Sequence, residues 1–124
     1  MDTERGAILL TSIIFAFVGL WALIDPAGMV SVVDLHPRSP DALADVRAMY
    51  GGLELAIATL LLYHAAEPER VPTGLGLGSL FVAGIGGGRL IGVVLSGFTM
   101  LSGTLLAFEL TAATVLAVLW WRAQ

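Results

Sequence analysis

The chain has no cysteine and no lysine, and only 13% of its 124 residues are charged. Without cysteine, disulfides, thiolate nucleophiles, cysteine-bound metals and thiol relays are excluded. All six basic residues are arginines, and they form no basic patch of the kind that binds nucleic acid. The net charge of −4 is spread over the predicted loops and forms no acidic tail. The composition therefore excludes thiol chemistry and gives no reason to expect a nucleic-acid partner.

Long uncharged runs dominate the sequence. Hydrophobic residues make up 57% of the chain, and its mean hydropathy is +0.90. Residues 6–24, 71–88 and 90–108 contain no Asp, Glu, Lys, Arg or His. Each run is close to the roughly 20 residues that a helix needs to cross a bilayer, and none alternates polar and apolar faces as a soluble bundle would. The sequence predicts an all-α fold, an integral membrane four-helix bundle that forms a single domain over residues 1–124.

We expect the spanning helices at about residues 6–24, 46–64, 74–95 and 103–121. The first run is interpreted as a span and not as a signal peptide, because its apolar part is long and Asp25-Pro26 follows it in place of a cleavage pattern. Ser39-Pro40-Asp41 has the N-cap, the proline and the acidic residue that begin a helix. Residues 96–102 read as a tight turn. Four hydroxyl residues within the spans can bond carbonyls of their own helix and need no other role: Ser12, Ser79, Thr111 and Thr114.

The segment from Ala27 to Pro40 is the one longer connection, and its apolar residues predict a short helix on the membrane surface. Arginines flank the spans unequally, with Arg5, Arg70 and Arg122 on one side and Arg38 and Arg47 on the other. This count favours both termini in the cytoplasm and an extracytoplasmic longer connection. We expect a bacterial inner membrane location.

The third predicted helix is rich in glycine. Gly84, Gly88 and Gly92 follow one another at the small-xxx-small spacing that lets a neighbouring helix approach closely. We interpret these three glycines as helix-packing residues, and a homo-oligomer is one arrangement that they would permit. We find no internal repeat in the sequence.

Three ionisable residues fall inside the predicted spans: Glu54, Arg89 and Glu109. Arg89 and Glu109 lie equally far from Thr99, the middle of the predicted third turn, so antiparallel helices should place them at similar heights. Glu54 comes about six residues after its helix enters the bilayer. At 1.5 Å per residue it therefore lies about 9 Å deep, measured from the same side. We therefore expect all three charges to meet in the outer half of the membrane.

Charged and polar residues also share one predicted face of the second span. On a regular α-helix Arg47, Tyr50, Gly51 and Glu54 lie at i, i+3, i+4 and i+7, which is one face. The predicted ligand-binding pocket is lined by Arg47, Tyr50, Glu54, Arg89 and Glu109. The alternative is an ion-pair cluster that only holds the helices in register. The carboxylates of Glu54 and Glu109 against Arg89 alone leave one negative charge uncompensated. Either Arg47 turns inward to neutralise it, or one of the two carboxylic acids stays protonated. A protonated carboxylic acid here would be a general acid or proton carrier.

Several of these features together resemble one protein family. They are Asp25-Pro26, the stretch Val46-Arg47-Ala48-Met49-Tyr50-Gly51-Gly52, the pair Gly88-Arg89, and Glu109. The chain resembles the DUF4345 family of small four-helix membrane proteins over nearly its whole length. Its most specific element is Arg-x-x-Tyr-Gly-Gly-x-Glu, from Arg47 to Glu54. The resemblance implies the topology and marks these polar residues as signature positions, but it implies no substrate. A more distant likeness is to DoxX-type proteins, whose thiol chemistry would find no cysteine here.

The leading functional prediction is an outer-leaflet pocket that binds a small amphipathic or lipid-like molecule, with arginines holding its polar head. Glu54, Tyr50 and Glu109 are the candidate catalytic residues if acid/base chemistry occurs there. We expect no cofactor and no metal, since His64 near Glu67 and Glu69 reads as a solvated helix end.

Two other classes stay open. One is a structural or accessory membrane subunit that oligomerises through the glycine-rich third helix. The other is a proton-coupled carrier of small molecules. We rank it last because alternating access usually needs two repeats that move relative to one another, and four helices without inverted repeats do not provide them.

Overall fold

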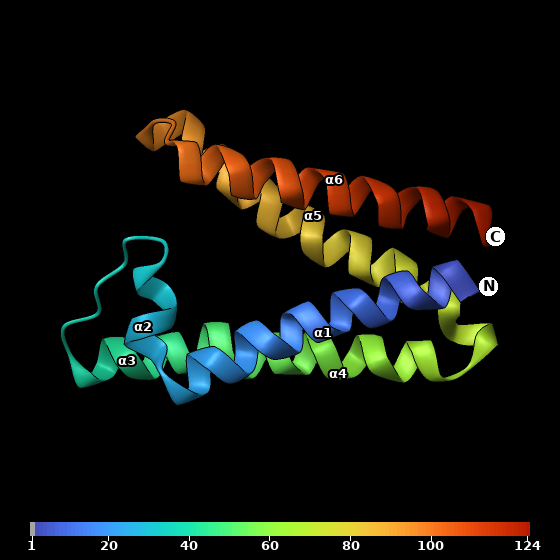
Figure 1. Cartoon of the computed structure of the whole chain (residues 1–124), viewed down its shortest axis with the longest axis horizontal. Helices are drawn as coiled ribbons and strands as arrows, with labels where there is room; N and C mark the ends of the chain where they lie inside the picture. Colours follow the sequence, from blue (N-terminus) through green and yellow to red (C-terminus); the bar gives the residue numbers. More distant parts are fainter. Residues whose placement is uncertain (1) are drawn as a thin grey trace. The chain divides into compact units, whose positions relative to one another are not determined.

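The computed structural model describes residues 2–124, and this part of the chain is helical without strands. Four of its helices are long and apolar enough to cross a membrane, which confirms the predicted all-α membrane class. The helical elements are α1 (Asp2–Ile24), α2 (Pro26–Ser31), α3 (Pro40–Val46), η1 (Arg47–Gly52), α4 (Leu53–Ala66), η2 (Pro68–Arg70), α5 (Val71–Ser96) and α6 (Met100–Arg122) (Figure 1). The second long helix is continuous through α3, η1 and α4, and the third through η2 and α5.

The chain divides into two compact units. The N-terminal unit comprises residues 9–63, which include most of α1 and α4 together with α2, α3 and η1. The C-terminal unit comprises the described residues through Ile8 and the segment His64–Gln124, with η2, α5 and α6.

Helix boundaries follow the capping residues that the sequence predicts. α1 ends at Ile24, and the Asp25 side chain accepts a hydrogen bond from the Gly28 N–H to begin α2. Ser39 is the N-cap of α3, with its hydroxyl accepting from the Ala42 N–H at 3.1 Å. The side-chain oxygens thus satisfy backbone N–H groups that have no partner within the first turn. The predicted start at Ser39-Pro40-Asp41 is confirmed.

The last connection is shorter than predicted. α5 continues to Ser96 and α6 begins at Met100, so the turn comprises residues 97–99 and not 96–102. Gly97 has φ of 102°, a backbone conformation that glycine adopts readily. Thr99 and Ser102 form a reciprocal capping box, in which Ser102 supplies the side chain that the motif usually takes from Glu or Gln. Ser102, which we assigned to the turn, therefore lies in the first turn of the helix.

The N-terminal unit is held together where α1 packs against the second long helix. The hydroxyl of buried Ser12 donates to the carbonyl oxygen of Ala58 at 2.8 Å. Gly19 and Gly51 lie at a close approach of the two backbones, because a Cβ at Gly19 would lie 3.0 Å from the Gly51 carbonyl oxygen. The expectation that Ser12 bonds its own helix is therefore wrong, because the facing carbonyl lies within reach.

The C-terminal unit has a similar bond between its two long helices. The Ser79 hydroxyl on α5 donates to the Ala113 carbonyl oxygen on α6 at 3.0 Å, so the prediction for Ser79 is also wrong. A Cβ added at Gly86 would lie 3.3 Å from the Cβ of Glu109. Glycine at this position therefore allows α5 to approach α6 closely.

The predicted short helix in the longer connection is α2. Met29 and Val30 of α2 are buried and pack with Ala22 of α1 and Val46 of α3. Apolar residues after α2, such as Leu35 at 45% exposed, lie outside this cluster. Its place at the membrane surface stays a prediction.

We expect Gly19→Ala to lower the free energy of unfolding by about 1–3 kcal/mol, as over-packing does. The added Cβ would lie 2.9 Å from Leu55 Cγ and close to backbone that cannot move aside. Gly6→Ala is the matched control, since a Cβ there meets no described atom within 4 Å and alanine favours the helix by about 1 kcal/mol. The measurement is unfolding in detergent followed by circular dichroism. Equal stability of the two variants would contradict this packing.

Candidate functional site

The Arg-x-x-Tyr-Gly-Gly-x-Glu element contains a π-helical turn, η1. The Leu53 N–H, at the end of this turn, bonds to the Ala48 carbonyl oxygen five residues earlier. Residues five apart differ by about 140° around a regular α-helix, but they stack in a π-turn. Val46 and Gly51 are five apart and both face α1: Val46 packs with Ala22, and Gly51 lies against Leu23. The wider turn is therefore explained by the packing of these two residues.

The π-turn changes which side chains share a face. One added residue rotates the remainder of the helix by about 100° relative to regular α-helical counting. The buried face of the second long helix accordingly includes Val46, Ala58 and Leu61, whereas Arg47 is exposed. Glu54 lies one turn before Ala58 on this same face and is half-buried. The prediction that Arg47 and Glu54 share one face is therefore wrong, because it assumed a regular α-helix.

Arg47 contacts the end of α1. Its Nε donates to the Leu23 carbonyl oxygen at 3.2 Å, one of the carbonyls at a helix end that has no partner within its own helix. This bond fixes the stem of the side chain and leaves the two terminal nitrogens of the guanidinium without a described ion-pair partner in residues 9–63. Tyr50 lies in the same π-turn and is 40% exposed.

Arg89 and Glu109 form a bidentate ion pair between α5 and α6. Arg89 Nε donates to both carboxylate oxygens, at 3.0 and 2.8 Å, and Nη2 donates to Oε1 at 2.7 Å. Glu109 is 8% exposed. The fork of the guanidinium matches the carboxylate, which is the strongest form of such a pair. The structure thus brings together two of the five predicted pocket residues, at the equal heights expected from Thr99.

Glu54 belongs to the other compact unit, so its predicted meeting with Arg89 and Glu109 stays a prediction. The N-terminal unit itself contains Arg47, Tyr50 and Glu54. The π-turn places Arg47 and Glu54 on different sides of the helix.

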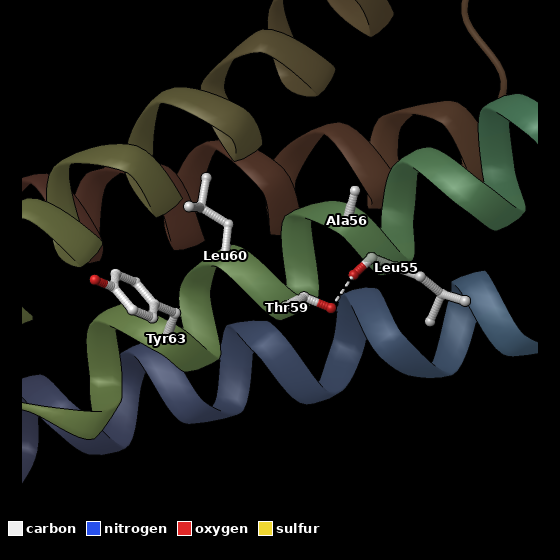
Figure 2. Close-up of a pocket in the computed structure, with 5 residues that line it drawn as sticks. All are labelled: Leu55, Ala56, Thr59, Leu60 and Tyr63. Carbon is white, nitrogen blue, oxygen red and sulfur yellow. Dashed lines mark hydrogen bonds between the residues drawn. The ribbon is translucent and has the colours of Figure 1, made fainter.

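A shallow, open apolar hollow that we did not predict from the sequence comes after the π-turn. It is lined by Leu55, Ala56, Thr59, Leu60 and Tyr63, all on α4 (Figure 2). The Thr59 hydroxyl is turned inward and donates to the Leu55 carbonyl oxygen at 2.8 Å, so the lining is largely apolar. The spacing of the last four residues, at i, i+3, i+4 and i+7, was the available signal. A second hollow, in the C-terminal unit beside Gly76 and Trp120, has no charged side chain in its lining.

The glycines of α5 differ from one another in their surroundings. Gly86 faces α6, whereas a Cβ at Gly84, Gly88 or Gly92 would meet no atom of α5 or α6 within 4 Å. Within the C-terminal unit these three glycines therefore leave one face of α5 uncovered.

These features define a small all-α membrane protein whose polar residues are concentrated in a π-turn and in one interhelical ion pair. Residues 3–121 match the family model described as a domain of unknown function, DUF4345. The chain belongs to the DUF4345 family. No curated protein and no solved structure matches it. The more distant likeness to DoxX-type proteins stays a prediction.

We expect Arg89→Gln or Glu109→Gln alone to lower the free energy of unfolding by about 3 kcal/mol. This is the lower end for breaking a buried pair, chosen because the Arg89 side chain keeps 27% of its surface exposed. The double variant, which carries both changes to Gln, should lose less than the sum of the two single changes, since it leaves no unpaired buried charge. A double-mutant cycle on thermal unfolding measures this. Simple additivity of the separate changes would contradict the pair.

Proposed function

We propose that this chain binds a small amphipathic or lipid-like molecule along its second spanning helix, with an acidic head group at Arg47 and an apolar tail in the hollow on α4. The observation that carries the proposal is the guanidinium of Arg47, which is exposed, held at Nε by the Leu23 carbonyl, and without a described carboxylate partner in residues 9–63. Arginine with free terminal N–H groups is well suited to a carboxylate or phosphate.

One end of the hollow, at Leu55, lies on the same flank of the helix as Arg47. Leu55 lines the hollow and also packs on Gly19 of α1, while Arg47 bonds to the end of α1. The Leu55 end of the hollow and the Arg47 guanidinium therefore both lie beside α1. From Leu55 to Tyr63 the hollow extends about 12 Å along the helix axis at 1.5 Å per residue. Apolar pockets with a few polar groups at one end are typical of sites for amphipathic ligands.

Tyr50 is positioned by the same π-turn and would supply a hydroxyl to the head group. π-turns within α-helices occur frequently at functional sites. Arg89 and Glu109 neutralise each other, so in this proposal they hold α5 and α6 together and do not bind the ligand. With both termini in the cytoplasm of a bacterial inner membrane, as the arginine count favours, the head-group site lies in the outer leaflet.

We expect Arg47→Gln to abolish the binding of oleate, because it removes the charge that holds the carboxylate. Oleate should raise the thermal midpoint of the wild type in neutral detergent, whereas oleyl alcohol should raise it little. Arg38→Gln is the matched control, since Arg38 is exposed in the longer connection. Ala56→Phe, which fills the hollow, should also reduce the oleate effect. An undiminished rise with Arg47→Gln would contradict the proposal.

A second candidate function is that of a structural or accessory subunit, favoured by the uncovered face at Gly84, Gly88 and Gly92. Small residues at this spacing let two helices in lipid pack closely. We expect Gly88→Leu to dissociate an assembly that Gly6→Leu leaves intact, because Gly6 lies outside this face. Light scattering of the purified chain in detergent measures the change. A wild type that is monomeric at every protein concentration tested would rule this function out.

A further inference from the structure

The two units contain the same arrangement of paired helices, and the clearest evidence comes from α1 and α5. Each has a serine whose hydroxyl donates to an alanine carbonyl on the facing helix: Ser12 to Ala58, and Ser79 to Ala113. Each then has a glycine at the same spacing where the facing helix approaches closely. The residues that the two helices share in register are Ser12, Ala16, Gly19, Leu23 and Ile24 in α1 and Ser79, Ala83, Gly86, Leu90 and Ile91 in α5.

The facing helices α4 and α6 repeat as well. Both contain the sequence Glu-Leu-x-x-Ala-Thr, from Glu54 to Thr59 and from Glu109 to Thr114. In both the alanine carbonyl accepts the serine bond, and the threonine hydroxyl donates to the leucine carbonyl, at 2.8 and 2.7 Å. The expectation that the chain has no internal repeat is therefore wrong. The matching residues are few, and they become recognisable once the hydrogen bonds show which positions correspond.

The repeat makes Glu54 the counterpart of Glu109 and Ala22 the counterpart of Arg89. Glu109 receives the Arg89 guanidinium through both of its oxygens. Ala22 instead packs in the apolar cluster with Met29 and Val30 of α2. The helix pair of the N-terminal unit has therefore kept the carboxylate without the guanidinium.

No other residue of the N-terminal unit replaces that guanidinium. Between residues 9 and 63 the basic side chains, apart from the histidine, are Arg38 and Arg47. Arg38 is exposed in the connection, and the π-turn rotates Arg47 toward the end of α1, where it bonds Leu23. His36 pairs with Asp34. Within residues 9–63 the structure thus records neither an ion pair nor a hydrogen bond for the Glu54 carboxylate.

We infer that Glu54 binds a cationic group with N–H donors, a guanidinium or a primary ammonium carried by an amphipathic molecule. The repeat supplies the chemistry, since this is how Arg89 binds the equivalent carboxylate of Glu109. A carboxylate within a membrane span is costly to keep unless it has a partner or a function, and an N–H fork is the partner that fits it best. This site is separate from the proposed head-group site at Arg47, which lies on another side of the helix.

Dodecylguanidinium is the probe, because its head is the group that Arg89 presents to Glu109. Added to the full chain in neutral detergent, it should raise the thermal midpoint of the wild type. Dodecyltrimethylammonium has the same charge and chain but no N–H donor, and should raise it little. The guanidinium effect should vanish in Glu54→Gln and persist in Asp45→Asn, an exposed acid on the same long helix. It should also persist in Arg47→Gln, which separates this inference from the proposed function.

Two results would overturn the inference. One is that dodecylguanidinium raises the thermal midpoint of Glu54→Gln as much as that of the wild type, or that the two cations raise the wild-type midpoint equally. The other is a lower midpoint of Glu54→Gln before any ligand is added, since loss of a partner arginine within the chain would have that effect. As a second variant, Glu54→Asp keeps the charge but withdraws it by one methylene. It should weaken the rise, and an undiminished rise would also refute the inference.

Discussion

A hydrogen bond from a serine hydroxyl to a facing backbone carbonyl is the interaction on which each helix pair depends. It occurs at Ser12 and at Ser79, and in both places glycine lies further along the same helix where the backbones approach. In lipid there is little hydrophobic drive between helices, so close contact of small residues and bonds between helices determine the register. The register in turn decides which charges meet: it places Arg89 opposite Glu109, whereas no arginine of residues 9–63 pairs with Glu54.

Much of the fold could be predicted from the sequence because the bilayer restricts a chain so strongly. Uncharged runs have to be helices, and Ser39 and Asp25-Pro26 mark boundaries that the structure confirms. The pairing of Arg89 with Glu109 could be predicted because the two residues lie equally far from Thr99 along the sequence. A tight turn between antiparallel helices places such residues at the same height. The capping box at Thr99 was missed because Ser102 takes the role of the usual acidic or amide residue.

The candidate site was harder to predict because it depends on an irregular turn. Arg47, Tyr50 and Glu54 were recognised as unusual residues, but their arrangement was derived from regular α-helical geometry. The π-turn arises from packing, as Val46 and Gly51 both have to face α1. The local sequence gives no signal of this packing requirement. The hollow from Leu55 to Tyr63 was missed for a different reason, since apolar residues within a span look alike until the fold shows which are covered.

The π-turn also has an evolutionary consequence. A π-turn in a continuous helix amounts to one residue more than the regular spiral requires, so the loss of a single codon near Gly52 would restore the regular form. Arg47 and Glu54 would then be six residues apart on a regular helix, about 120° from one another, which is the angle at which the π-turn already holds them. The π-turn thus lets the chain differ in length by one residue while the buried faces of α3 and α4 stay aligned and the arginine and the carboxylate stay apart.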